Sequence, residues 1–414
     1  MPAQFTLPPD TRVVFGGNPP ADINALTDAV TAMGAALNPL SAAFAGGADP
    51  TGAADSTAAL NAWLAALGGG AGRGSWPAGT YKTTAPLAVP PGASWQGDGG
   101  WDPKLWGRIG TVIYPDSSFT GASVISVSDG GVNGVAGPRM RHFSVDGSRL
   151  PASVAGITVT GAVNEGLIED VAIASVTGAG FVVASSANGF PHSWHGQRVK
   201  VNAAGGNCFT ISNLADSTLI DFFALGSTGG HGVSVSGACP NTRLIGWRSE
   251  WNAGGAGKYG YFLGGAWGTG TGSGGLKMTG CTSDRNDLDG WHIVATGTVP
   301  LNLAGCGARR DGRNGGSGGG GLAGLSIQAA TIPVLISGFD VFPGVDDNGT
   351  GTNSPQIGGQ VTGTNSMVII NGAHFHGQVT GWATPGTGVH TRGMSQSTGS
   401  TSAPTGPSQV TDIA

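Results

Sequence analysis

The sequence predicts an all-β protein, a right-handed parallel β-helix with a short helical segment at its N-terminus. Two observations indicate this solenoid: two short apolar motifs recur every 24 to 34 residues, and 78 of the 414 residues are glycine. Hydrophobic residues still make up 39% of the chain, and tryptophan occurs 11 times. The glycines therefore belong to a turn-rich fold with a core, and not to a disordered chain.

The first motif is a small residue, an apolar residue, a variable residue and a second apolar residue. Alternation with a period of two is typical of a strand that has one buried face. The first position of the motif is occupied by Gly156, Gly180, Cys208, Gly232, Gly260, Gly290 and Gly324.

The second motif places a glycine after a strand of the same alternating kind. Two strand families per repeat, with no helix between them, make one coil of a solenoid, and stacked coils share a continuous core. A sandwich or a propeller fits less well, because these folds need hairpin turns every 8 to 12 residues or so, or repeats of about 40 to 50 residues. The glycines of the second motif are Gly246, Gly280, Gly305, Gly338 and Gly372.

The N-terminal segment, residues 1–45, is expected to contain one helix over residues 22–37. Two heptads are too few to be stable alone in water. The pattern fits a helix packed on its own domain and a short self-association segment of a trimer equally well. Its apolar residues are Ile23, Leu26, Val30, Met33 and Leu37.

Three motifs follow: a glycine–aspartate turn at 47–52, the P-x-G-x-Y sequence at 77–81 and a Gly-Asp-Gly at 97–99. With a helix near 55–67, they resemble the opening of the pectate-lyase-like right-handed parallel β-helix domain of bacteriophage tailspikes and minor tail proteins. The resemblance covers roughly residues 44–340. It implies a homotrimeric virion component, attached to other tail proteins through its N-terminus.

The helix near 55–67 is expected to cap the solenoid, because the first coil would otherwise expose its core face to water. The β-helix domain is expected to extend over residues 46–380. Residues 381–414 are rich in Ser, Thr, Gly and Pro and predict an extended tail.

Composition excludes several classes of partner. The net charge is −5 and no Lys/Arg cluster occurs, so neither nucleic acid nor an anionic membrane is expected as a partner. No apolar run approaches the ~18 residues of a membrane span. The N-terminus lacks the pattern of a signal peptide, which favours synthesis in the host cytoplasm. The place in the virion tail is what the resemblance implies.

The four cysteines show neither a disulfide framework nor zinc-ligand spacing. Cys281 and Cys306 occupy equivalent positions and are expected to stack inside the coils as free thiols, with a disulfide as the minor alternative. His374 and His376 share one strand face but lack a third ligand. No metal and no other cofactor is expected.

Polar residues follow the second motif at constant offsets, and equivalent residues on neighbouring coils of a β-helix lie about 4.8 Å apart. Two carboxylates at about 5 Å, Glu250 and Asp284, would suit a retaining glycosidase. Arginine beside a carboxylate would suit a lyase. The first polar row is Glu250, Asp284 and Arg309; the second is Trp251, Arg285 and Arg310; the third is Asn252, Asn286 and Asp311.

A structural role is favoured over catalysis for these rows. The third polar row is expected to form a ladder in a turn, because Asn and Asp tolerate left-handed backbone. The first polar row is expected to be a solvated row of ion pairs of little energetic value. The histidines fall on different coils, so no catalytic triad is expected among His192, His195, His231 and His292.

Aromatic residues flank the polar rows and are expected to stack on sugar rings. These are Trp251, Tyr259, Tyr261 and Trp267, and the polar contacts to the glycan are expected from Arg285, Arg309, Arg310 and Asp311.

Together, the rows and the resemblance favour a phage tail protein that attaches to its host by recognising a surface polysaccharide, with avidity from three copies. Two alternatives stay open. One is a polysaccharide depolymerase, a glycoside hydrolase or lyase that uses Glu250 and Asp284. The other is a structural tail or baseplate component that binds no glycan.

Overall fold

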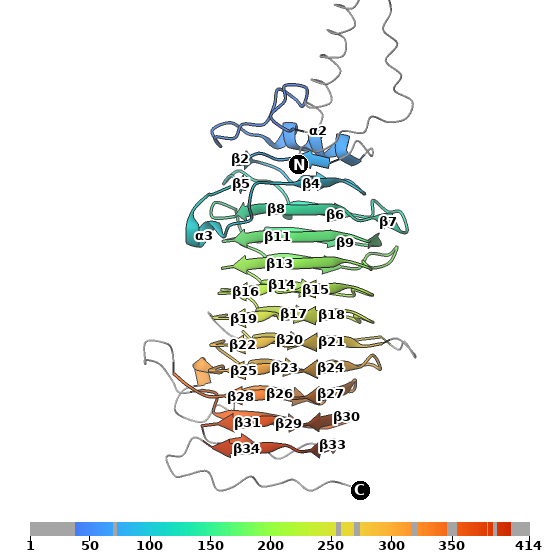
Figure 1. Ribbon diagram of the computed structural model, residues 1–414, viewed down its shortest axis with the longest axis vertical. Coiled ribbons are helices and arrows are strands. Elements are labelled where there is room, and N and C mark those ends of the chain that lie inside the picture. Colours follow the sequence, from blue (N-terminus) through green and yellow to red (C-terminus); the bar gives the residue numbers. More distant parts are fainter. Residues whose placement is uncertain are drawn as a thin grey trace, which may run out of the picture.

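The described residues form a rod of stacked coils, with helix α2 at its N-terminal end and strand β34 near its C-terminal end (Figure 1). The helix expected at 22–37 lies outside the described residues. The computed structural model describes residues 38–68, 73–253, 258–268, 274–315, 322–345, 354–378, 380–383 and 387–398.

Two long sheets run along the rod, one of 21 strands and one of 11. Neighbouring strands in each sheet belong to successive coils and pair in parallel. Met278, for example, pairs with Leu244 of the preceding coil and Leu303 of the next. The fold is a right-handed parallel β-helix, which confirms the fold class and the stacking of the second motif.

The 21-stranded sheet bends along its length into two faces, which we call the first and second face. The first face contains β1 (Arg73–Ser75), β4 (Ser94–Gln96), β15 (Thr218–Ile220), β18 (Arg243–Ile245), β21 (Leu276–Thr279), β24 (Leu301–Ala304), β27 (Pro333–Ser337), β30 (Thr364–Asn371) and β33 (Thr387–Arg392). The second face contains β2 (Gly79–Thr83), β5 (Thr111–Pro115), β16 (Phe223–Leu225), β19 (Arg248–Glu250), β22 (Thr282–Asp284), β25 (Gly307–Arg309), β28 (Asp340–Phe342), β31 (His374–Gly377) and β34 (Ser395–Thr398). Three longer strands continue through both faces: β8 (Arg139–Asp146), β11 (Leu167–Ala174) and β13 (His195–Asn202).

The 11-stranded sheet forms the third face and carries the first motif. Phe181 pairs with Ile157 and with Phe209, as the motif predicts. Its strands are β3 (Leu87–Val89), β6 (Ser123–Ser128), β9 (Ala155–Thr160), β12 (Phe181–Ala184), β14 (Phe209–Ile211), β17 (Val233–Val235), β20 (Tyr261–Leu263), β23 (Trp291–Ile293), β26 (Ala323–Gln328), β29 (Ile357–Thr362) and β32 (Thr380–Trp382). The remaining short elements are β7 (Val135–Ala136), β10 (Val163–Asn164), α3 (Pro103–Trp106) and the 3-10 helix η1 (Arg313–Gly315).

From β15 onward each described coil therefore has a strand on each of the three faces, where the sequence predicts two strands per coil. The strands of the second face are the ones missed. Many of these strands are only three residues long, and each such strand has a single inward side chain, as Ser249 in β19 and Ser283 in β22 show. A single inward residue, polar as in β19 or apolar as Val341 in β28, gives no alternation to recognise.

The corner between the first and second faces requires left-handed backbone. In the C-terminal coils the corner residue is glycine, as at Gly246 (φ +67°) and Gly280 (φ +62°). A Cβ atom at either glycine would meet no atom within 4 Å, so backbone conformation and not space favours glycine here.

Helix α2 (Thr57–Gly68) covers the N-terminal end of the rod. Trp63 is fully buried, and its ring meets Trp76 edge-on at 5.4 Å and Trp95 at 6.3 Å between centroids. Asp55 accepts a hydrogen bond of 3.0 Å from the backbone N–H of Thr57 at the start of the helix. The helix therefore keeps water from the core of the first coil.

At the other end, the coils extend beyond residue 380, where the sequence predicts a tail. Strand β33 pairs with β30, and β34 pairs with β31, so pairing reaches at least to Thr398. The composition of residues 381–414 did not predict these strands, because a terminal strand needs few large apolar residues. Within the described residues, no helix has the length and apolarity needed to cross a membrane.

Candidate functional site

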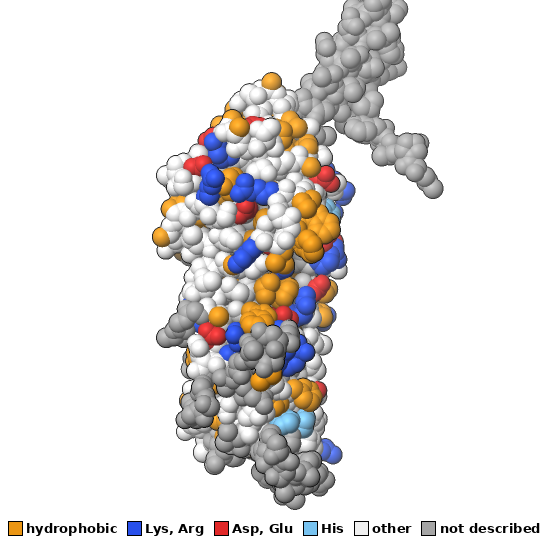
Figure 2. Space-filling view, turned by 90° about the vertical axis from the view of Figure 1, so that its left-hand side faces the viewer, with side chains coloured by type: hydrophobic (Ala, Val, Ile, Leu, Met, Phe, Trp, Pro, Cys, Tyr) orange, Lys and Arg blue, Asp and Glu red, His pale blue; other side chains and the backbone are white. Residues whose placement is uncertain are grey.

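The first polar row lines a hollow of about 460 Å³ on the second face, where β19, β22, β25 and β28 lie side by side. We call it the Asp284 groove. Figure 2 shows basic and acidic side chains next to hydrophobic ones at mid-height on this side of the rod. The residues that give it its chemistry are Arg248, Glu250, Asp284, Arg309, Asp340 and Phe342.

Strand register assembles the first polar row as predicted. Glu250 pairs with Asp284, and Asp284 pairs with Arg309. The next residue in register is Phe342, whose side chain is large, apolar and 47% exposed. The groove thus presents carboxylate, guanidinium and an aromatic ring on consecutive coils.

Asp284 is buried and forms the centre of a cluster of arginines, so it is not part of a solvated row as expected. Its Oδ2 lies 2.6 Å from Arg285 Nη2 and 2.7 Å from Arg309 Nη2, and its Oδ1 lies 2.9 Å from Arg310 Nε. A buried carboxylate requires such pairing, and charge-assisted bonds of this length are strong. Asp284 therefore anchors three guanidinium groups, and both of its oxygens are engaged.

Glu250 differs from Asp284, its partner in register on the next coil, because its carboxylate is not held by arginine. Its carboxylate forms no hydrogen bond or ion pair with the described residues, although it is half-buried. Burial raises its pKa, and the positive charge of Arg248 partly opposes this shift. Glu250 is therefore the carboxylate of the groove that is best placed to exchange a proton or to accept a ligand's hydroxyl group.

The second polar row supplies the left-handed residues of the turn. Trp251, Arg285 and Arg310 have φ values of +56°, +58° and +55°. Two guanidinium groups, those of Arg285 and Arg313, each lie 4.5 Å from the centroid of the Trp251 ring. The indole is therefore already stacked on arginine, and a sugar would have to displace one of these groups to stack on it.

The third polar row forms the predicted ladder, but the left-handed residues are those of the row before it. Asn252 Nδ2 donates to Asn286 Oδ1 (2.7 Å), and Asn286 Nδ2 donates to Asp311 Oδ1 (2.7 Å). All three side chains are fully buried, so the expectation that Asp311 contacts a glycan is wrong. Burial raises the pKa of Asp311 to about 7.

Two of the expected sugar-stacking aromatics lie in the core. Trp267 is fully buried, and its indole N–H donates to the carbonyl of Gly264 at 3.0 Å. Tyr261 is fully buried as well, with its hydroxyl donating to the carbonyl of Trp247 at 2.9 Å. Tyr261 follows Gly260 in the first motif, whose alternation places this position inside. Trp267 lies outside both motifs, so no alternation indicates which way its ring points.

Tyr259 is half-buried beside the third face, in a stack of rings that the sequence analysis missed. Its ring lies 4.1 Å from that of His292 at an angle of 7°, and 5.2 Å from that of His231. His292 Nδ1 lies 2.9 Å from Asp289 Oδ2. Burial lowers the pKa of His231 to about 4, so this imidazole is neutral at pH 7. His231 and Tyr259 are one repeat apart in the sequence, and this spacing could have predicted that their rings lie on neighbouring coils.

Cys281 and Cys306 are buried free thiols, as predicted. The rings of His374 and His376 lie 6.4 Å apart. In the part of the chain that the structure describes, no group of three His, Cys, Asp or Glu side chains is arranged to hold a metal ion.

Neither a scan of protein-family models nor a search of curated proteins found a match to this sequence. Comparison with solved structures does find the fold elsewhere. The A-module of mannuronan C-5 epimerase AlgE6 from Azotobacter vinelandii superposes with a TM-score of 0.59 at 15% identity, covering 86% of this chain and 98% of the module.

Two phage proteins are also similar. Tailspike protein 2 of the Escherichia coli O157:H7 bacteriophage CAB120 matches with a TM-score of 0.60 at 15% identity, over 83% of this chain but only 42% of the tailspike. The gp42 tailspike of Acinetobacter phage vb_AbaP_AS12 matches with a TM-score of 0.52 at 12% identity, over 91% of this chain and 66% of the tailspike. The resemblance stated from the sequence is confirmed for the fold: this chain is a right-handed parallel β-helix of the kind found in phage tailspikes.

Proposed function

We propose that this protein is a phage tail protein that attaches to its host by binding a surface polysaccharide in the Asp284 groove. The observation that carries the proposal is the continuous row on the second face, in which Arg309 and Phe342 are exposed beside the buried Asp284. Sugar sites commonly combine an apolar surface with a few fixed polar groups.

The arginines of the groove are already oriented for a ligand. The Arg309 side chain is 57% exposed, yet one of its nitrogens is held at 2.7 Å by Asp284. A guanidinium has five N–H donors in a planar fork. The N–H groups of Arg309 that point away from Asp284 form no hydrogen bond with any described residue. Pre-organisation of this kind reduces the entropy lost on binding.

The place in a virion is supported by the sequence resemblance and by the two tailspikes among the similar structures. A homotrimer attached through its N-terminal segment would present three grooves to one polymer, and linked sites raise the overall affinity.

A depolymerase is the second candidate, because Glu250 has a raised pKa and no partner within the described residues. A raised pKa favours the protonated carboxyl, which is the form that a general acid needs. A mechanism with two catalytic carboxylates is disfavoured, because both oxygens of Asp284 are bound to arginine.

The test measures binding and cleavage of host surface polysaccharide by the full-length protein and by Arg309→Gln. The control is Lys104→Gln, which removes one exposed charge on α3. We expect Arg309→Gln to weaken binding about tenfold, equivalent to about 1.4 kcal/mol, and the control to bind like wild type. Equal affinity of both variants and wild type would overturn the groove as the binding site.

Cleavage is followed by new reducing ends and by the absorbance of unsaturated uronate. Binding without product supports attachment alone. Product that disappears in Glu250→Gln would instead make the protein a depolymerase, and absence of both binding and product would leave a structural tail component.

A further inference from the structure

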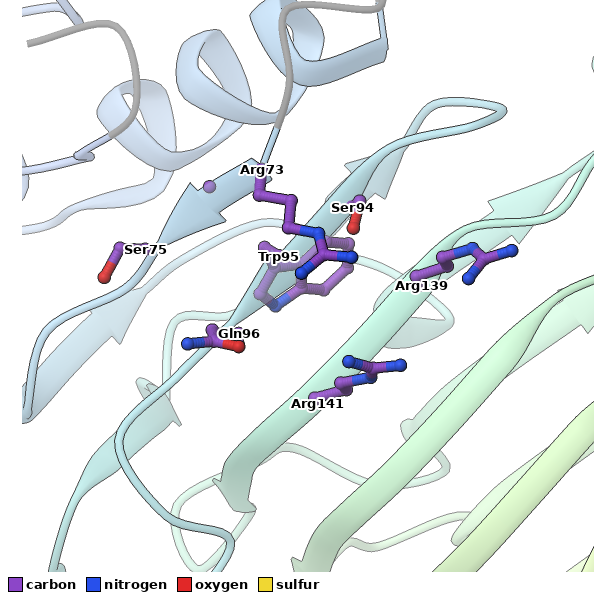
Figure 3. Close-up of a pocket in the computed structure, with 8 residues that line it drawn as sticks. Arg73, Ser75, Ser94, Trp95, Gln96, Arg139 and Arg141 are labelled. Atoms are coloured by element: carbon purple, nitrogen blue, oxygen red, sulfur yellow. The ribbon is translucent and has the colours of Figure 1, made fainter. Parts of the chain in front are cut away.

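A second hollow, of about 150 Å³, lies at the N-terminal end of the first face, across β1, β4 and β8. We call it the Arg73 pocket. Figure 3 shows the Arg73 side chain extending from β1 over the neighbouring strand β4, with Arg139 and Arg141 on β8. Ser75, Ser94 and Gln96 also line it.

Strand register explains why these side chains meet. Arg73, Ser94 and Arg139 form one row across the three strands, and Ser75, Gln96 and Arg141 form the next row. Residues two apart on a strand point to the same side of a sheet. Since adjacent strands lie about 4.8 Å apart, the backbones of Arg73 and Arg139 are about 10 Å from each other. The two rows therefore bring three guanidinium groups and no carboxylate onto one small surface.

The positive charge of the pocket is poorly balanced. Arg141 Nε lies 3.3 Å from Glu169 Oε2, but the other oxygen of Glu169 is bound by Arg198 at 2.8 Å. Arg73 and Arg139 form no ion pair with any described residue. Arg73 and Arg139 are exposed, so their N–H donors are open to a ligand. In the Asp284 groove, by contrast, a carboxylate of the protein already binds the arginines.

The size and chemistry of the pocket define the ligand group. A hollow of about 150 Å³ has room for one oxyanion group with its remaining water, and it is much smaller than the Asp284 groove. Guanidinium groups bind carboxylate, sulfate and phosphate in bidentate fashion, and the hydroxyl of Ser94 and the amide of Gln96 add neutral donors.

Beyond the pocket, the same row continues along the first face. From Arg139 it passes through Leu167, His195, Thr218, Arg243 and Lys277, one residue per coil. His195, Arg243 and Lys277 are exposed, and the row contains no acidic residue. Along this row a polymer lying parallel to the rod would meet neutral or basic side chains, and the carboxylate in the row beside it, Glu169, is paired with Arg141 and Arg198.

We propose that the Arg73 pocket binds an oxyanion substituent of an acidic polysaccharide that lies along the first face. The inference rests on the proposed function, to which it adds the class of glycan, a polyanion, and a second contact apart from the Asp284 groove.

The test titrates the full-length protein with polygalacturonate, with dextran sulfate and with neutral dextran. The pocket variant is Arg73→Gln/Arg139→Gln. The matched control is Lys104→Gln/Arg149→Gln, which removes two exposed charges away from the first face. We expect the pocket variant to bind at least one of the two polyanions tenfold more weakly than wild type, the control to stay within twofold, and neutral dextran to bind much more weakly than either polyanion. Thermal unfolding of both variants should match wild type, because all four side chains are exposed.

An equal loss of polyanion affinity in the pocket variant and in the control would overturn the proposal, because such a loss would reflect net charge alone. Saturation by inorganic sulfate or phosphate without binding of either polymer would also overturn it, leaving a free anion as the ligand. A pocket variant that binds host polysaccharide normally while Arg309→Gln does not would refute this inference and keep the proposed function. If the pocket variant loses affinity for host polysaccharide while Arg309→Gln binds it normally, the result would support the inference and refute the Asp284 groove as the binding site.

Discussion

Two ladders of polar side chains run along this rod, and they differ in burial. The exposed ladder of the N-terminal coils consists of His142, Asp170 and Arg198, which occupy the left-handed corner between the first and second faces. Asp170 lies 3.2 Å from His142 Nδ1, and its Oδ2 lies 2.8 Å from Arg198 Nη2. The buried ladder is the third polar row, whose amide and carboxyl groups bond one another beneath the Asp284 groove.

The difference indicates which polar residues determine the structure. At the exposed corner, the C-terminal coils use glycine in place of the charged residue, so the ion pairs are dispensable to the fold. In the buried ladder each group would be left without a partner if its neighbour were removed, which is costly away from water. The left-handed arginines that precede this ladder are thereby fixed in position, and with them the groove.

The largest loss of stability is expected for Asn286→Ala, which removes the central side chain of the buried ladder. Asn286 accepts from Asn252 and donates to Asp311 and to the carbonyl of Ser249. Several buried groups would lose their partners, at about 1–3 kcal/mol each. We expect the free energy of unfolding, measured in urea, to fall by about 3–5 kcal/mol. A loss below about 1 kcal/mol would show that the ladder does not hold the coils together.

A pH titration of stability separates the two ladders. The pKa of Asp311 is raised by burial from 3.8 to about 7 in the folded protein, so its contribution to stability is full below about pH 4 and is lost as the pH rises through 7. Asp170 behaves oppositely: Arg198 lowers its pKa, and its contribution is lost as the pH falls through the folded pKa.

The variant that isolates this effect is Asp311→Asn, which keeps the shape of the side chain. We expect it to be more stable than wild type at pH 8 and to lose the decline in stability between pH 4 and pH 7. A decline of the same size in the variant would mean that another group causes it.

A smaller loss of stability is expected for Gly280→Ala, at the corner between the first and second faces. A Cβ there has space but the backbone is left-handed, at φ +62°, which costs about 1 kcal/mol or slightly more for a residue other than glycine. The melting temperature should fall by a few degrees. An unchanged value would indicate that the corner tolerates any residue, and that the glycine repeat has some other cause.

The smallest change is expected for Asp170→Gly, which converts an exposed corner into the kind found at Gly280. The glycine relieves left-handed strain while the exposed ion pairs with His142 and Arg198 are lost, and such pairs contribute about 0–1 kcal/mol. The free energy of unfolding should stay within about 1 kcal/mol of wild type. A loss as large as that of Asn286→Ala would make the two ladders equivalent.

The sequence was sufficient to predict the coils and their register. Apolar alternation specifies one buried face, and stacked coils put equivalent residues beside each other. The pairing of Leu244 with Met278 and of Glu250 with Asp284 follows from the positions of two glycines. The ladder of Asn252, Asn286 and Asp311 was predicted in the same way.

Features that depend on the direction of single side chains were not predictable. The second face was not predicted because its three-residue strands are too short to show alternation, and because some of their inward residues, such as Ser249 and Ser283, are small and polar. Trp267 lies outside both motifs, and the structure buries it completely with its indole N–H on the carbonyl of Gly264. The Arg73 pocket gave no periodic signal, since Arg73, Ser94 and Arg139 are 21 and 45 residues apart in coils of unequal length.

The most direct test of the binding site is a structure of the protein with an oligosaccharide released from the host's surface polysaccharide. We expect sugar density in the Asp284 groove, with hydroxyl or carboxylate oxygens on Arg309 and a ring against Phe342. Sugar bound elsewhere on the rod, with this groove left to water at saturating ligand, would contradict this expectation.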